Sequence, residues 1–149
     1  MQININPSKW DPRFLEMAKL VASWSKDPST QVGAVIIRPD KTVASVGFNG
    51  FARGMFDNPD DYNSRPLKYS KVLHAEMNAL LFCKEPMFGY SMYVWPFLCC
   101  DRCAVHMIQA GIFRVVAPKF NMSLRPEWQG SWDRAQEYLH EASVDVRFV

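Results

Sequence analysis

The pairing of His74-Ala75-Glu76 with Cys100-x-x-Cys103 constrains this chain more than any other feature of its sequence. One imidazole and two thiols are the ligands of a catalytic zinc site, whereas a structural site uses four protein ligands. Glu76 follows His74 by two residues, so its carboxylate can lie near the metal without binding it. Three ligands leave one position for water, and Glu76 supplies a base. The pattern therefore predicts a zinc hydrolase.

The spacing of the two cysteines indicates how they reach the metal. Cys100 and Cys103 are three residues apart, so at the start of a helix they lie on one face. His74 opens a second predicted helix. Two helix N-termini would then converge, and their positive dipole ends favour thiolates and bound anions. The two motifs together are a strong signal, whereas either motif alone would be weak.

Two other residues, Cys99 and His106, leave alternatives open. Cys99 could replace Cys100 as a ligand, but a four-residue step to the last cysteine is a rarer zinc spacing. His106 continues the cysteine face of its helix, but a cluster on that helix alone would leave the His-x-Glu motif without a role. Cys83 is expected to be a small core residue.

Length and composition are those of an ordinary globular protein. With 149 residues, the chain is expected to form a single domain over residues 1–149. Apolar residues make up 48% and charged residues 21%. No apolar run approaches the ~18 residues of a membrane span, and the N-terminus lacks a basic region followed by an apolar one. We therefore expect a cytoplasmic protein, whose crowded cysteines suit metal binding better than disulfides.

The net charge of +2 limits the class of partner. Lys and Arg are spread along the chain, so there is no basic stripe of the kind that binds long nucleic acids. A nucleotide monophosphate needs only one or two cations and some backbone N–H groups. The charge therefore disfavours long polyanions and is compatible with a small anionic substrate.

Hydrophobic periodicity predicts four helices and five strands. The helices are expected at residues 12–24, 72–83, 101–110 and 132–142, and the strands at 32–37, 42–48, 91–96, 113–117 and 144–148. This order predicts a mixed sheet covered by helices on both faces, with sites beyond the strand ends. The polar stretch 51–71 has no clear period and is expected to be a long loop, a candidate lid or subunit contact.

These residues resemble the zinc-dependent cytidine/deoxycytidylate deaminase family, and within it the deoxycytidylate (dCMP) deaminases. The family signature is His-x-Glu followed by Pro-Cys-x-x-Cys. Here Pro96 stands four positions before Cys100 instead of directly before it. Four segments carry the resemblance: Ser25-Lys26-Asp27-Pro28-x-x-Gln31-Val32-Gly33-Ala34, Gly47-Phe48-Asn49-Gly50, His74-Ala75-Glu76-x-Asn78-Ala79 and Ile108-Gln109-Ala110-Gly111-Ile112.

The resemblance implies a fold and a reaction. The fold is a three-layer α/β/α cytidine-deaminase-like arrangement with a five-stranded mixed sheet. One Zn²⁺ is held by His74, Cys100 and Cys103. A zinc-activated water attacks C4 of cytosine, Glu76 carries protons to N3 and the amino group, and ammonia leaves. The reaction converts dCMP to dUMP.

The resemblance also assigns substrate contacts and an assembly. The backbone N–H of Ala75 holds the base O2, Asn49 binds the sugar and Val32 packs on the base. Ser25 and Lys26 lie in the loop where the family binds phosphate, although such residues are also typical of a solvated turn. The family's habit implies a homo-oligomer such as a hexamer, with a small-molecule nucleotide as the partner and no membrane.

Two further hypotheses remain at the level of sequence. The chain could deaminate a modified cytosine nucleotide, a free nucleoside or base, or an adenosine in tRNA, and the absence of a basic patch weakens the last of these. It could instead be a non-catalytic zinc module. Glu76 argues against that hypothesis, because a structural site has no use for an uncoordinated carboxylate.

Overall fold

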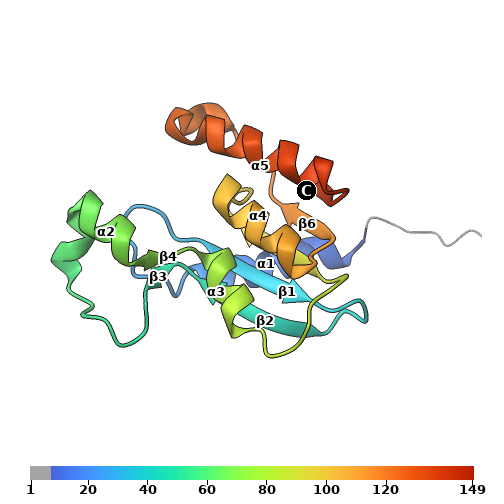
Figure 1. The fold of residues 1–149 in the computed structure, drawn as a ribbon, viewed down its shortest axis with the longest axis horizontal. Helices are drawn as coiled ribbons and strands as arrows, with labels where there is room; N and C mark the ends of the chain where they lie inside the picture. The colour runs from blue at the N-terminus through green and yellow to red at the C-terminus, as the bar shows by residue number, and fades with distance from the viewer. Residues whose placement is uncertain (1–7) are drawn as a thin grey trace, which may run out of the picture.

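A five-stranded mixed sheet in the order β2-β1-β5-β6-β7 crosses the computed structural model, which describes residues 8–149 (Figure 1). The strands are β1 (Gly33–Ile37), β2 (Val43–Phe48), β5 (Ser91–Trp95), β6 (Arg114–Ala117) and β7 (Asp145–Phe148). β1 pairs antiparallel with β2 and β5, whereas β5, β6 and β7 are parallel. The predicted five-stranded mixed sheet is confirmed. The expectation that the N-terminus is not a leader concerns residues 1–7, which lie outside the described residues.

Helices cover both faces of this sheet. They are α1 (Trp10–Ala22), α3 (Ala75–Phe82), α4 (Asp101–Ala110) and α5 (Gln129–Glu141). β1 is buried along its whole length. Val35 and Ile37 pack with α1, whereas Ala34 and Ile36 belong to the core beneath α3, α4 and α5. No helix within residues 8–149 is both long and apolar enough to cross a membrane.

The segment predicted as one long loop, residues 51–71, is more ordered than its sequence indicates. It contains the 3₁₀ helix η1 (Pro59–Asn63) and the helix α2 (Arg65–Lys71), and it is closed by a ribbon of β3 (Gly50–Phe51) with β4 (Val72–Leu73). None of the residues of α2 is buried, so no hydrophobic period marks this helix. Two more 3₁₀ helices, η2 (Met122–Leu124) and η3 (Pro126–Trp128), lie between β6 and α5.

Asp11 lies inside the first helix, which begins two residues before the predicted start at residue 12. Helix α1 starts at Trp10, and the buried Asp11 carboxylate accepts hydrogen bonds from the Tyr93 hydroxyl at 2.7 Å and from Arg114 at 2.7 and 2.9 Å. Burial opposes ionisation of Asp11, but the hydrogen bonds from Arg114 and Tyr93 outweigh it and lower its pKa. This cluster attaches α1 to β5 and β6.

The strand register brings three loops to one edge of the sheet. Gly33, the first residue of β1, pairs with both Phe48 at the end of β2 and Trp95 at the end of β5. Three segments therefore lie side by side at this edge. They are the loop that ends at β1, the residues that follow β2 and the loop that leads from β5 to α4. These loops contain most of the residues that the sequence marks as functional.

Gly47 allows helix α3 to lie directly on β2. A Cβ atom at this position would lie 2.4 Å from the Ala75 carbonyl oxygen and 2.4 Å from the Ala79 backbone nitrogen. The Asn78 amide donates to the Phe48 carbonyl at 2.8 Å, which fixes the same turn of the helix. Contact between the two backbones thus sets the position of the N-terminus of α3.

Gly47→Ala is expected to lower the free energy of unfolding by about 1–3 kcal/mol or more, because backbone atoms must move to admit the methyl group. The matched control is Gly50→Ala, where the added Cβ has nothing within 4 Å. That control should change stability by no more than about 0.5 kcal/mol. Urea denaturation of both variants measures the difference, and equal stabilities would contradict the close packing of α3 on β2.

Candidate metal centre and the adjoining cavity

His74 stands at the junction between β4 and α3. Its backbone is extended (φ −69°, ψ 154°), and it is the N-cap residue whose carbonyl accepts the Asn78 N–H at 3.0 Å. Pairing of β4 with β3 fixes the chain on one side of His74, and α3 fixes it on the other. The imidazole is therefore held by regular structure on both sides.

The two cysteines of the motif open helix α4 as the spacing predicts. Cys100 is the N-cap residue, and its Sγ accepts the backbone N–H of Cys103 at 3.4 Å. His74 Nδ1 lies 3.4 Å from the Sγ of Cys100 and 3.4 Å from the Sγ of Cys103. All three ligand atoms lie within 4.8 Å of one another.

This geometry fits a tetrahedral zinc ion. Zinc bonds of about 2.0 Å to nitrogen and about 2.3 Å to sulfur place two such ligands about 3.5 Å apart. The two N–S distances of 3.4 Å agree with that value. Within residues 8–149, His74, Cys100 and Cys103 are the one group of three with metal-ligand spacing. A single ion with three protein ligands fits the donor set.

Protons within this group are distributed unevenly. Contact with the Cys100 thiolate raises the pKa of His74 to about 9 despite burial. A hydrogen bond from Cys103, helped by His74, lowers the pKa of Cys100 to about 4. The pKa of Cys103 is raised by its contact with Cys100 and by burial. The three side chains thus compete for protons, and a metal ion would bind them by displacing those protons.

Glu76 lies beside the three ligands but outside their group. Its side chain is buried, and its Oε2 accepts from the Sγ of Cys103 at 3.6 Å. Burial raises the pKa of Glu76, and the positive charge of His74 acts against that shift. A raised pKa makes the protonated form of Glu76 easier to reach, which suits a carboxyl group that both accepts and releases a proton.

The residues that offered alternative ligands lie elsewhere. Cys99 is buried in the core cluster, where burial raises the pKa of its thiol well above the ordinary value. His106 is on the exposed side of α4 with Nδ1 2.7 Å from the Arg102 carbonyl oxygen. Cys83 is half-buried and packs against the core, as predicted. The structure therefore places Cys100, and not Cys99, against His74.

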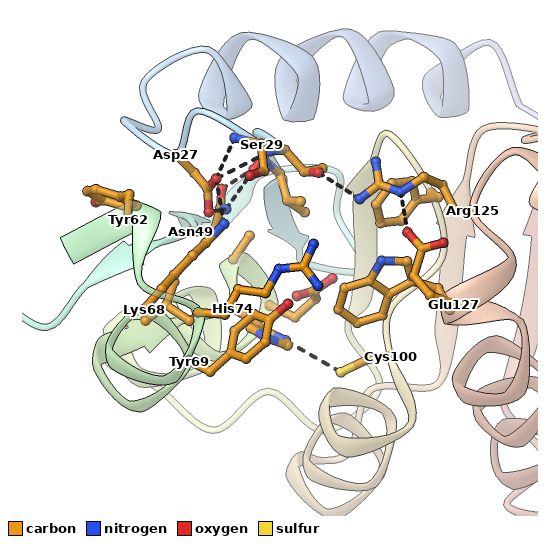
Figure 2. A pocket seen from close by; sticks show the side chains of 18 of the residues that line it. Asp27, Ser29, Asn49, Tyr62, Lys68, Tyr69, His74, Cys100, Arg125 and Glu127 are labelled. Atoms are coloured by element: carbon orange, nitrogen blue, oxygen red, sulfur yellow. Dashed lines mark hydrogen bonds and ion pairs between the residues drawn. The ribbon is translucent and has the colours of Figure 1, made fainter. Parts of the chain in front are cut away.

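A cavity of about 370 Å³ opens over His74 and Glu76 (Figure 2). Ala75, Val32 and Asn49 also line it, so three of the predicted substrate contacts share the cavity with the predicted ligands. Aromatic side chains form much of the wall, namely Tyr62, Tyr69, Phe97, Trp128 and Trp132. A concave, partly apolar pocket with a few polar groups is the usual form of a small-molecule site.

Asn49 uses its side chain to order the loop before β1. Its Oδ1 accepts the Val32 N–H at 2.8 Å, and its Nδ2 donates to the Thr30 carbonyl at 2.9 Å. Ser25 is buried, does not line the cavity, and donates its hydroxyl to the Asn49 carbonyl at 2.7 Å. Both residues therefore shape the cavity wall that carries Val32.

Lys26 is not brought to the cavity. Its ammonium pairs with Asp57, and 72% of its side chain is exposed. The cationic side chains that do line the cavity are Arg65, Lys68 and Arg125. Sequence reasoning missed all three, because α2 has no hydrophobic period and Arg125 lies in a loop that the family motifs do not include.

Helix α5 supports the turn that carries the cysteines, and this contact was also missed. The Asp101 N–H donates to Ser131 Oγ at 3.0 Å, and Ser131 Oγ donates to the Asp101 carboxylate at 2.8 Å. Arg134 pairs with the same carboxylate at 2.8 Å, and the Trp132 indole donates to the Leu98 carbonyl at 2.9 Å. These contacts hold the residues on both sides of the candidate ligand Cys100.

The ligand assignment can be tested by metal content. Cys100→Ala is expected to lose bound zinc, because two protein ligands bind the ion much more weakly than three. Cys99→Ala is the matched control and should retain about one zinc per chain. Elemental analysis of the two purified variants measures this, and the opposite pattern would assign the site to Cys99.

The support from α5 predicts a milder effect on the metal. Ser131→Ala removes both contacts to Asp101 and should speed zinc transfer to a chelator, on the order of tenfold. Ser123→Ala is the matched control, since its exposed hydroxyl bonds only to Asn121 among the described residues. Equal rates of zinc loss from the two variants would show that α5 does not support the ligand turn.

Comparison with known proteins identifies the family. A family model described as the cytidine and deoxycytidylate deaminase zinc-binding region matches residues 8–119. An uncharacterized deaminase from the luxG 3′ region of Aliivibrio fischeri is 44% identical over 142 residues, which are 95% of either chain. The deoxycytidylate deaminase of Mus musculus is 39% identical over 114 residues, or 72% of this chain, and the match spans 64% of the mouse protein.

The fold also has solved counterparts. The dCMP deaminase of cyanophage S-TIM5 in apo form has a TM-score of 0.73 at 21% identity, and the match covers 94% of this chain and 97% of that one. The structure of the same phage enzyme in complex with dCMP and dUMP has a TM-score of 0.71. At this identity the likeness establishes a shared fold. The match to the family model and the identity with the sequence relatives establish the family as well. The chain belongs to the zinc-binding cytidine and deoxycytidylate deaminase family.

Proposed function

We propose that this chain is a zinc-dependent deaminase that converts dCMP and water to dUMP and ammonia. The observation that carries the proposal is the position of Glu76, a buried carboxyl group that lies beside the group of three candidate ligands and lines a cavity with aromatic and cationic walls. Relatives named deoxycytidylate deaminase support the choice of reaction. The phage enzyme of the same fold has been solved in complex with dCMP and dUMP, which supports the choice of substrate.

His74, Cys100 and Cys103 would hold the zinc. When bound, zinc acts as a Lewis acid and lowers the pKa of a coordinated water to about 7. Three protein ligands would leave zinc able to bind a water, and His74, Cys100 and Glu76 all line the cavity from which that water would come. The lowered pKa of Cys100 favours the thiolate form that binds a metal.

Glu76 would move the protons of the reaction. Its carboxylate accepts a proton from the water that attacks C4 and delivers it to N3 of the ring. The same group then transfers the second proton of that water to the amino nitrogen, so that the C4–N bond breaks and ammonia leaves. Atoms balance as cytosine plus water giving uracil plus ammonia. The raised pKa of Glu76 suits a group that must alternate between acid and base.

The cavity wall would hold the cytosine base. Ala75 is the first residue of α3, where a backbone N–H has no partner within the helix and is free for the base O2. Val32 lines the cavity and would pack on the ring. Asn49 would contact the sugar, although its amide also orders the adjoining loop.

The other hypotheses have less support. A tRNA substrate requires an extended basic surface, which the net charge of +2 does not favour. A non-catalytic zinc module gives no reason to bury Glu76 beside the ligands. A modified cytosine nucleotide is the second candidate, because the cavity has aromatic walls against which an added apolar group could pack.

The setting of the enzyme is part of the proposal. We propose a single domain over residues 1–149 that acts in the cytoplasm as a homo-oligomer such as a hexamer. Large apolar side chains on the outer face of α3 support association, since Leu81 and Phe82 are 58% and 41% exposed. Gel filtration with light scattering would measure the mass of the assembly.

Glu76→Gln is expected to keep zinc and fold but lose about 10²–10⁴-fold or more in turnover of dCMP, because the amide cannot transfer protons. Ammonia release and zinc content are measured on the same sample. Unchanged turnover would remove Glu76 from the mechanism. Loss of zinc with the activity would make Glu76 a ligand instead.

A substrate panel tests the proposed reaction itself. Ammonia release is measured with dCMP, deoxycytidine, CMP, dCTP, cytosine and adenosine at equal concentrations. We expect dCMP to have the highest kcat/KM and adenosine to be inactive. Efficient release from adenosine, or from no cytosine compound at all, would overturn the proposal.

A further inference from the structure

Three cationic side chains line the cavity, and they differ in how they are already paired. Lys68 of α2 donates to the Asp27 carboxylate at 2.9 Å, and both side chains are largely buried, with 12% and 4% exposed. A buried pair of this kind is costly to separate. Lys68 is therefore committed to Asp27 and to the loop that Asp27 orders through the backbone N–H groups of Ser29 and Thr30.

Arg125 and Arg65 are placed differently. Arg125 reaches across the cavity and donates to the Thr30 hydroxyl at 3.0 Å, and it pairs with Glu127 at 3.0 Å (Figure 2). The Glu127 side chain is 59% exposed, so this pair contributes little to stability. Arg65 lines the same cavity from α2, and the described residues give its guanidinium no hydrogen bond or ion pair.

Glu127 lies within the field of both arginines. The pKa of Glu127 is lowered first by its own backbone N–H, then by the hydrogen bond and charge of Arg125, and also by the charge of Arg65. Arg125 pairs with this carboxylate, and Arg65 lines the same cavity from a segment about sixty residues away in the sequence. Two arginines that line one cavity can together bind a phosphate monoester.

We propose that Arg65 and Arg125 receive the 5′-phosphate of the substrate and that Glu127 occupies this place as an internal anion until the nucleotide binds. The inference rests on the proposed function and names the phosphate contacts of the same site. A phosphate monoester carries about −1.5 to −2 charges near neutral pH and three acceptor oxygens, compared with one charge on the carboxylate. Exchange of Glu127 for the phosphate is favourable because the exposed carboxylate can turn to solvent.

The arrangement also gives a reason for preferring nucleotides to nucleosides. A nucleoside leaves Glu127 in place and gains nothing from the two arginines. A monophosphate replaces a weak, exposed pair with charge-assisted contacts to two guanidinium groups. Selectivity for the phosphate therefore resides in α2 and in the segment before η3, and not in the Ser25-Lys26 loop, whose ammonium pairs with Asp57 on the surface.

Steady-state kinetics with dCMP and deoxycytidine test this assignment. Arg65→Gln and Arg125→Gln should each lower kcat/KM for dCMP by about tenfold or more. The same variants should change kcat/KM for deoxycytidine by less than about threefold. Glu127→Gln should raise kcat/KM for dCMP by about two- to fivefold, because the competing anion is gone. Lys26→Gln is the matched control and should leave kcat/KM for both substrates unchanged.

Binding of the product class provides a readout that does not depend on turnover. Calorimetry with dUMP and deoxyuridine should show that Arg65→Gln and Arg125→Gln weaken the binding of dUMP and leave the binding of deoxyuridine unchanged. If the wild type releases no ammonia but binds dUMP in this arginine-dependent way, the proposed function fails and the phosphate assignment stands.

Three results would overturn the assignment while leaving the deaminase chemistry intact. The first is equal efficiency of the wild type on dCMP and deoxycytidine, with equal affinity for dUMP and deoxyuridine. The second is an equal loss of kcat/KM for both substrates in the two arginine variants, which would mean that these residues only maintain the fold. The third is a selective loss of dCMP turnover in Lys26→Gln.

Discussion

The arrangement of the site depends on the antiparallel register that pairs Gly33 with both Phe48 and Trp95. This register places the end of β2, the start of β1 and the end of β5 at one edge of the sheet. The close approach of α3 to β2 at Gly47 then fixes where His74 can lie. Because α4 begins shortly after β5 ends, its cysteines arrive at the same edge. A shift in either contact would separate the imidazole from the thiols.

Much of this arrangement was predictable from short-range signals. Apolar runs or apolar–polar alternation marked all five strands of the sheet, of which β1, β5 and β6 are mostly buried and β7 has no buried residue. The three-residue step from Cys100 to Cys103 predicted a helix start, and that helix begins at Asp101. The assignment of zinc is confirmed for the family by the zinc-binding region that matches residues 8–119. The ligand set itself stays a prediction that the geometry supports.

The rest could not be predicted, since it depends on contacts between segments that are distant in sequence and rich in polar residues. Helix α2 has no buried residue, so its sequence carries no period from which to infer a helix. The ion pair of Lys26 with Asp57 joins residues 31 apart, and it directs that ammonium away from the cavity. Arg125 and Ser131 act through contacts to Thr30 and Asp101, for which no local pattern exists.

The central claim is an open zinc site with one nitrogen and two sulfur ligands from the protein, beside an uncoordinated Glu76. Zinc K-edge X-ray absorption of the purified protein measures this shell directly. The account predicts two sulfur atoms at about 2.3 Å and two nitrogen or oxygen atoms at about 2.0–2.1 Å, of which one is His74. Loss of bound zinc in His74→Ala, as in Cys100→Ala, would agree, because either variant leaves only two protein ligands. A shell of three or four sulfur atoms, or a shell unchanged by Cys100→Ala, would contradict the account.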